Sequence, residues 1–263
     1  MSRIIAVANQ KGGVGKTTTC VNLAASLAAN RRRVLLVDMD PQGNATVGCG
    51  IDKNRLERTN YEVLVGEVGL EAASFHVDDA GFTLLPANGD LTAAEVALMD
   101  SDERERRLAA LLVPVAPNYD HILLDCPPSL NILTVNALVA ADRVFIPIQC
   151  EYYALEGLTA LLDTIRRVQR TANPDLEIEG LLRTMFDGRN NLATQVGEQL
   201  IEYFDDKVYR TQIPRNVRLA EAPSHGRPVL QYDRTSRGAV AYMAVASEML
   251  RRQGTGDAVA SAG

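Results

Sequence analysis

The fold of this chain is decided by the stretch Asn9-Gln10-Lys11-Gly12-Gly13-Val14-Gly15-Lys16-Thr17-Thr18-Thr19. It follows an apolar run at residues 4–8 and opens a segment with helical spacing at residues 17–29. Glycines between a strand and a helix let consecutive backbone N–H groups face phosphate oxygens, and the helix start adds partial positive charge. In such a loop Lys16 reaches the β and γ phosphates of a nucleotide, and the Thr17 hydroxyl binds Mg²⁺. The stretch therefore predicts a phosphate-binding loop.

Short apolar runs alternate with segments of helical spacing along the rest of the chain. Continuous apolar runs suit strands that are covered on both faces, and they occur at residues 4–8, 34–37, 122–124, 144–148 and 178–182. Helices are predicted at residues 17–29, 91–99, 104–112, 131–140, 154–170 and 192–204. Strands that alternate with helices indicate βαβ units, so the predicted fold class is α/β, with an open, doubly wound and mostly parallel sheet.

The composition is typical of a globular protein. The chain has 263 residues, of which 46% are hydrophobic and 23% are charged, and its net charge of -6 argues against a surface that attracts nucleic acid everywhere. No apolar run approaches the roughly 20 residues of a membrane-spanning helix, and the first residues lack a secretory signal. We therefore expect a cytoplasmic protein with a single domain over residues 1–253 and a disordered tail of small residues at 254–263.

The phosphate-binding loop departs from the ordinary pattern GxxxxGK[ST]. Gln10 occupies the position of the first glycine, and a second lysine, Lys11, follows it. The loop thereby resembles the deviant Walker A pattern KGGxGK[ST] of the ParA/Soj partition ATPases, which belong to the ParA/MinD superfamily of P-loop NTPases. The resemblance extends from Arg3 to about Arg252.

This resemblance implies an ATPase that forms ADP and phosphate and dimerises when it binds ATP. Lys11 is expected to reach across the dimer interface to the partner's nucleotide, with Gly12 and Glu151 at the same interface. Glu151 equally fits an ordinary acidic residue at a helix start. The ATP-binding residues implied by the loop are Lys11, Gly12, Gly13, Val14, Gly15, Lys16, Thr17 and Thr18.

Carboxylates follow two other apolar strands, in residues 34–44 and 122–129. Ligands of open α/β sheets bind at the carboxyl ends of the strands, so these carboxylates are expected beside the phosphate-binding loop. By resemblance Asp125 holds Mg²⁺ through its water shell, Asp40 positions the attacking water, and Asp38 supports the metal. Either Asp38 or Asp40 alone would fit a turn at a strand end, but their coincidence with the loop favours the functional interpretation. The implied metal set is Thr17, Asp38 and Asp125, and the implied catalytic set is Lys11, Lys16 and Asp40.

Two later segments resemble the parts of this family that contact the base. They are residues 185–187 and 213–216, and they make Met185, Pro214 and Asn216 the candidates for contact with adenine. Pro214 also fits an ordinary turn proline.

A basic stretch at residues 207–237 holds seven lysines and arginines against two acidic residues, a local net charge of +5. By resemblance, Arg218 in this stretch and Arg189 before it contact DNA. Arg215, which also lies in residues 207–237, is a third candidate. Contacts of arginine with phosphate give affinity that is independent of sequence and sensitive to salt, so non-specific double-stranded DNA is the expected partner. Each of these arginines taken alone also fits a solvated surface residue.

The family resemblance also implies the partners and the place of action. The ATP dimer coats nucleoid DNA, and a ParB-type protein bound at a centromere-like site stimulates hydrolysis and releases the dimer, which segregates a chromosome or plasmid. Because the first strand begins at Arg3, we expect no helix-turn-helix domain before it and no sequence-specific operator recognition.

Other members of the superfamily fit less well. A MinD-like membrane-cycling ATPase needs a basic, apolar amphipathic helix at its end, and the residues after Gln253 contain no Lys, Arg, Leu, Ile or aromatic residue. A related cargo-positioning ATPase remains a second alternative, and a tyrosine kinase would need a tyrosine-rich tail. An iron-sulfur ATPase needs paired cysteines, whereas reduced and mostly buried thiols are expected at Cys20, Cys49, Cys126 and Cys150.

Overall fold

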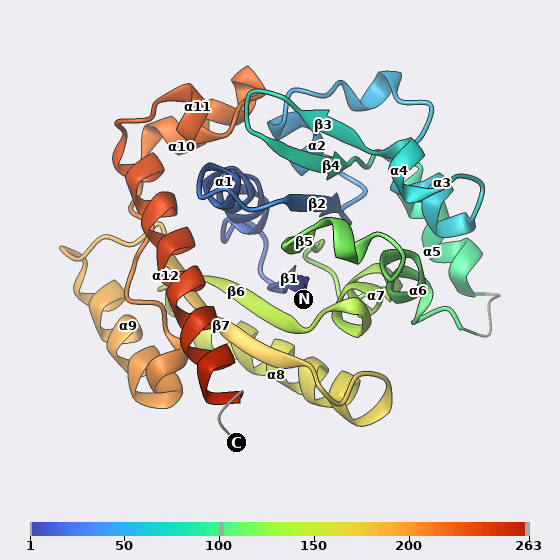
Figure 1. Cartoon of the computed structure of the whole chain (residues 1–263). Coiled ribbons are helices and arrows are strands. Elements are labelled where there is room, and N and C mark those ends of the chain that lie inside the picture. Colours follow the sequence, from blue (N-terminus) through green and yellow to red (C-terminus); the bar gives the residue numbers. More distant parts are fainter. Residues whose placement is uncertain (1, 100–102, 261–263) are drawn as a thin grey trace.

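A seven-stranded sheet forms the centre of the molecule (Figure 1), a computed structural model that describes residues 2–99 and 103–260. The strands lie in the order β3-β4-β2-β5-β1-β6-β7; the edge strand β3 is antiparallel to β4, and the other neighbours are parallel. The strands are β1 Arg3–Val7, β2 Val34–Asp38, β3 Phe75–Val77, β4 Phe82–Leu85, β5 His121–Asp125, β6 Arg143–Gln149 and β7 Glu177–Thr184. The predicted α/β class with a mostly parallel sheet is confirmed, although β3 and β4 had not been predicted.

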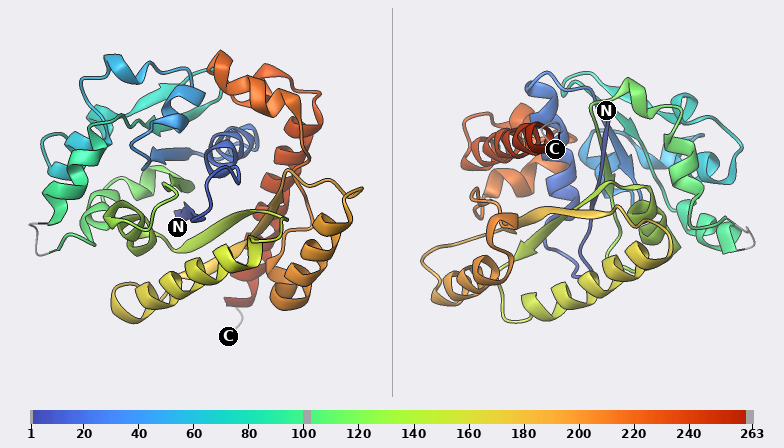
Figure 2. Two further views of the ribbon diagram at one scale, coloured as in Figure 1. Left: turned by 180° about the vertical axis from the view of Figure 1, so that it is seen from behind. Right: turned by 60° about the horizontal axis from the view of Figure 1, so that its bottom comes forward.

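Helices cover both faces of the sheet, and every strand except the edge strand β3 divides its side chains between two apolar cores. In β2, for example, Leu35 and Val37 enter one core, and Val34 and Leu36 enter the other. Helices α7 (Ile132–Ala140) and α8 (Ala154–Thr171) cover the first face, while α1 (Lys16–Ala29) and α12 (Arg237–Ala260) cover the second (Figure 2). This burial on both faces explains why the strands read as continuous apolar runs.

The six predicted helices are present, and the largest difference is at α6, which begins at Arg107 instead of residue 104. The remaining α-helices are α2 Asn44–Gly48, α3 Asn60–Val65, α4 Leu70–Ala73, α5 Leu91–Met99, α6 Arg107–Leu112, α9 Asn191–Phe204, α10 Val217–Glu221 and α11 Val229–Tyr232. Short 3-10 helices lie at Lys53–Arg55, Ala116–Asn118, Asp205–Lys207 and Ala222–His225. Within the described ranges, no helix combines the length and the apolarity that crossing a membrane requires.

Helix α12 was missed by the sequence analysis. It packs along α1, and small alanines such as Ala239 and Ala246 make up much of its buried face beside Tyr242, Val245 and Met249. A face of small residues gives a weak apolar period, which is why the pattern did not stand out. The helix continues to Ala260, past the expected end of the domain at residue 253, and residues 261–263 of the predicted tail lie outside the described residues.

Candidate nucleotide-binding site

The phosphate-binding loop lies at the carboxyl end of β1 and leads directly into α1. Gly13 and Gly15 have positive φ angles of 75° and 86°, which a side chain would strain, and Gly15 is the residue before the first turn of α1. No side chain caps this helix start, so its N–H groups remain for an outside acceptor. The loop thus has the backbone form that phosphate binding needs.

Hydrogen bonds to the strands β6 and β7 hold the loop in place. The Asn9 amide donates to the carbonyl of Pro147 in β6 at 2.8 Å, and the Thr184 hydroxyl at the end of β7 donates to the carbonyl of Val14 at 2.8 Å. The loop is therefore fixed against the sheet at both of its ends, as a preorganised anion site requires.

The two loop lysines point in different directions. Lys16 Nζ is buried and donates to the Lys11 carbonyl at 3.2 Å; burial lowers the pKa of Lys16, and the nearby Asp125 carboxylate opposes that shift. Lys11 Nζ instead pairs with Glu151 Oε2 of the same chain at 2.6 Å, where both side chains are partly exposed. The structure therefore brings together two of the residues assigned to a dimer interface, Lys11 and Glu151.

Two carboxylates lie side by side at the ends of β2 and β5, because Asp38 and Asp125 are register partners. Asp38 Oδ2 accepts hydrogen bonds from the backbone N–H and the hydroxyl of Thr46 at 2.9 and 2.7 Å, and Oδ1 accepts from the Asp40 N–H at 3.2 Å. Burial raises the pKa of Asp38 in spite of these bonds. Asp38 therefore holds the start of α2 against the end of β2.

Asp125 is also fully buried, but only one of its oxygens has a partner among the described residues. Cys20 Sγ donates to Oδ1 at 3.3 Å, and Oδ2 is buried without a hydrogen bond. Burial raises the pKa of Asp125, and the charge of Asp38 raises it further, while the Thr17 side chain opposes the shift. A buried carboxylate oxygen without a partner beside a threonine hydroxyl suits a hard cation such as Mg²⁺.

Asp40 lies in the turn that follows β2. Its Oδ1 accepts from the Gln42 N–H at 2.9 Å, its carbonyl accepts from the Gly43 N–H at 2.8 Å, and little of its surface is exposed. Gly43 has a positive φ of 60°, and a Cβ there would come within 2.6 Å of the Ala87 carbonyl oxygen. This turn therefore fixes where the Asp40 carboxylate stands next to the loop.

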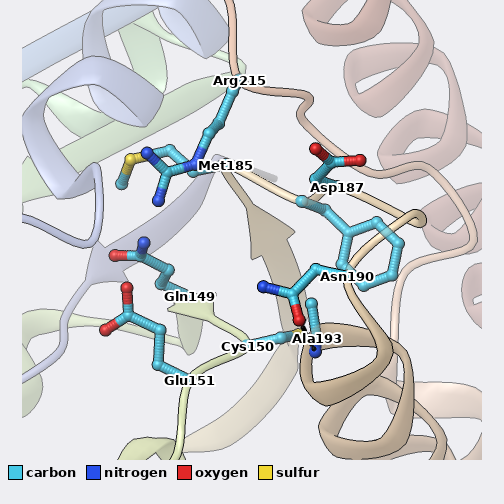
Figure 3. A pocket seen from close by; sticks show the side chains of 9 residues that line it. Gln149, Cys150, Glu151, Met185, Asp187, Asn190, Ala193 and Arg215 are labelled. Atoms are coloured by element: carbon cyan, nitrogen blue, oxygen red, sulfur yellow. Dashed lines mark hydrogen bonds between the residues drawn. The ribbon is translucent and has the colours of Figure 1, made fainter.

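A small cavity of about 60 Å³ lies at the ends of β6 and β7 (Figure 3). Met185 lines it and has a φ of +48°, a strained conformation for a residue other than glycine. In Figure 3 the Arg215 side chain lies beside Met185, above Gln149 and Glu151. The sequence analysis did not single out Gln149, whose place in the cavity results from the pairing of β6 with β7.

The other two candidates for adenine contact, Pro214 and Asn216, do not line this cavity. Pro214 lines a second cavity, beside Phe186, and the two residues form an isolated bridge between their backbones. Asn216 is the N-cap of α10 and accepts from the Leu219 N–H at 3.2 Å, so its side-chain oxygen already has a structural partner.

The candidate DNA-binding arginines differ in their surroundings. Arg189 forms a two-bond ion pair with Asp187, at 2.9 and 2.8 Å. Arg218 pairs with Glu221 at 2.8 Å and with Asp233 at 3.3 Å. Arg189 and Arg215 line the second cavity together, and the residues that line it do not include Arg218.

All four cysteines are buried and free, which confirms the predicted thiol state.

Comparisons with known proteins bear on this site. A family model described as an AAA domain matches residues 2–178. The sporulation initiation inhibitor protein Soj of Bacillus subtilis is 55% identical over 249 residues, which cover 95% of this chain and 98% of that protein. The chromosome partitioning protein ParA of Myxococcus xanthus is 52% identical over 252 residues, which cover 96% and 89%. A solved structure of cobyrinic acid a,c-diamide synthase from Mycobacterium smegmatis, with bound ADP and magnesium, has a TM-score of 0.86 at 41% identity and covers 97% of both chains.

Proposed function

Because the chain belongs to the ParA/Soj family of chromosome-partitioning ATPases, we propose that its ATP-bound form is a dimer that binds double-stranded DNA without sequence preference. A ParB-type centromere-binding protein stimulates hydrolysis, and the ADP form leaves the DNA. Repeated cycles on the nucleoid then segregate a chromosome or plasmid. The observation that carries this proposal is the loop at the end of β1, with an uncapped helix start, a buried lysine and an unpartnered carboxylate oxygen around one point.

The loop residues have distinct tasks in ATP hydrolysis. The N–H groups of residues 12–18 and the ammonium of Lys16 hold the phosphates, and Asp40 orients the attacking water. Thr17 and Asp125 would hold Mg²⁺, which would neutralise charge on the phosphate oxygens. Within residues 2–99 and 103–260, no three acidic, His or Cys side chains form a group that could hold a metal ion. Asp38 supports this edge by holding Thr46.

The position of Lys11 supports the proposed dimerisation. Its ammonium lies outside its own phosphate loop, against Glu151, and both side chains are partly open to solvent. The adjacent Tyr152 and Tyr153 are exposed by 74% and 66% and pack edge to face at 5.0 Å. Exposed aromatic side chains next to a charged pair suit a protein interface, and ATP favours this dimer if Lys11 contacts the partner's phosphates.

The proposal is tested by gel retardation of a DNA fragment without preferred sequence, in the presence of ATP, ADP or no nucleotide. The parent protein should retard DNA when ATP is present, and not with ADP or without nucleotide. Lys16→Gln should lose this activity with every nucleotide because it cannot hold the phosphates. The double variant Arg189→Glu and Arg218→Glu should bind ATP normally and fail to retard DNA. Retardation by the parent that is equal with ATP and ADP would contradict the proposed switch.

A further inference from the structure

A cationic cleft lies beside Phe186 and Pro214. Its volume is about 440 Å³, and its lining includes three arginines, Arg189, Arg215 and Arg237. These residues come from three separate segments, the loop after β7, the loop before α10 and the first turn of α12. The fold thus gathers positive charge that the sequence disperses over almost 50 positions.

One carboxylate lies in this cleft among the arginines. Asp187 accepts two hydrogen bonds from the Arg189 guanidinium, and its Oδ1 also accepts from the Arg189 backbone N–H at 3.1 Å. The hydrogen bonds from Arg189 and the charge of Arg215 lower the pKa of Asp187 to about 2. Asp187 is therefore ionised at neutral pH.

A carboxylate and a phosphate offer arginine the same two-oxygen acceptor. The pair of Asp187 and Arg189 is solvent-exposed, with 91% of the Arg189 side chain accessible, and an exposed ion pair of this kind exchanges its partner at little cost. Among the described residues, neither Arg215 nor Arg237 pairs with an acidic side chain within salt-bridge distance. The cleft therefore holds the paired guanidinium of Arg189 and that of Arg237, which can accept an anion, while the Arg215 side chain lies beside Met185 in the neighbouring cavity.

We propose that this cleft binds a backbone phosphate of double-stranded DNA, with Arg237 as a contact residue and Asp187 as an internal competitor that occupies the phosphate's place when DNA is absent. The inference rests on the proposed DNA binding and adds a device that regulates it. When the phosphate enters, Arg189 exchanges Asp187 for the phosphate, and the freed carboxylate takes up a cation from solution. Asp187 thereby weakens the binding of every DNA sequence equally and keeps release easy.

Counterion release gives this mechanism a measurable signature. Each phosphate contact contributes about 0.9 to the slope of log K against log salt, and cation uptake by a freed carboxylate opposes it. Asp187→Asn should therefore raise DNA affinity about fivefold for each chain in contact and steepen the salt dependence by up to about one per chain. Arg237→Gln should lower affinity and make the dependence shallower by about 0.9 per chain.

A matched control is available at Asp52. Asp52 pairs with Arg55 at 3.3 Å and accepts from the Asn54 N–H at 3.1 Å, so it repeats the arrangement of Asp187 at a position outside the cleft. Asp52→Asn changes the net charge by the same amount as Asp187→Asn. In both variants the asparagine oxygen can keep the backbone hydrogen bond that orders the turn.

The experiment measures DNA affinity by fluorescence anisotropy at several salt concentrations, with the full chain, a non-hydrolysable ATP analogue and excess Mg²⁺. The inference is supported if Asp187→Asn binds more tightly with a steeper slope while Asp52→Asn matches the parent. It is overturned if the two variants change alike, or if Arg237→Gln keeps the parent's slope. If Arg237→Gln weakens a fluorescent ATP analogue as much as it weakens DNA, the cleft serves the nucleotide and the inference fails. Failure of the parent to bind DNA at all would instead overturn the proposed function.

Discussion

The buried charges at the phosphate-binding loop and the exposed arginines near the basic stretch are arranged in opposite ways. At the loop, Asp38 and Asp125 are fully buried next to each other, and Asp125 Oδ2 has no hydrogen-bond partner among the described residues. On the surface, Arg189 and Arg218 each have a carboxylate within 3 Å. The first region contains a buried carboxylate oxygen that no described residue satisfies, whereas Arg189 and Arg218 in the second carry charge that is already neutralised.

This difference matches two kinds of ligand. A buried charge without a partner lowers the stability of the empty protein, and a ligand that satisfies it recovers that free energy on binding. Exposed ion pairs contribute little and exchange easily, which suits a surface that must bind any sequence and let it go. The contrast between the candidate nucleotide site and the proposed DNA surface leads to three predictions.

The largest effect is expected at Asp125. Asp125→Asn removes a carboxyl group whose ionisation is opposed by burial and by Asp38, so the nucleotide-free protein should unfold at a higher temperature than the parent at neutral pH. The same change removes a metal-binding oxygen and should lower ATP hydrolysis by about 100-fold or more. Added Mg²⁺ and ADP should raise the melting temperature of the parent and have much less effect on this variant, which differential scanning fluorimetry measures.

The neighbouring carboxylate supplies the control for this prediction. Asp38 already accepts hydrogen bonds from Thr46 and from the Asp40 backbone, so Asp38→Asn leaves a buried donor facing a donor. We expect it to lower the free energy of unfolding by about 1–3 kcal/mol. If the two substitutions shift stability in the same direction, the contrast between a satisfied and an unsatisfied carboxylate is wrong.

The sequence predicted the loop because its information is local. Lys11, Gly15 and Lys16 lie within the same short loop, and their positions follow from the strand before it and the helix after it. The pairing of Lys11 with Glu151 and the gathering of three arginines in one cleft depend on the order of the strands and on α12, which no local pattern contains. Helix α12 itself was missed because its buried face is rich in alanine.

An intermediate effect is expected at Lys11. Its side chain is more exposed than the buried carboxylates at the phosphate-binding loop and less exposed than the surface arginine Arg189. Lys11→Ala should remain monomeric with ATP, because loss of a charge-assisted contact weakens the dimer about tenfold or more for each chain. Since the Lys11 side chain points to Glu151 and not into its own loop, ATP affinity should change far less than in Lys16→Ala. Sedimentation velocity with a non-hydrolysable ATP analogue measures the dimer, and a dimeric Lys11→Ala protein would exclude Lys11 from the interface.

The smallest effect separates the two surface arginines. Arg218 has two carboxylate partners, and Glu221 also accepts from the Tyr232 hydroxyl at 3.1 Å, whereas Arg189 has the single partner Asp187. A guanidinium with two carboxylate partners loses more interaction energy when it leaves them to bind a phosphate. Arg189→Gln should therefore weaken DNA binding about fivefold, and Arg218→Gln should weaken it less. Because the freed carboxylates take up cations, salt titrations of DNA binding should show a slope reduced by well under about 0.9 for each Arg189 removed, and by still less for Arg218. A larger loss at Arg218 would mean that the ion pairs around it hold the arginine ready for phosphate and do not compete with it.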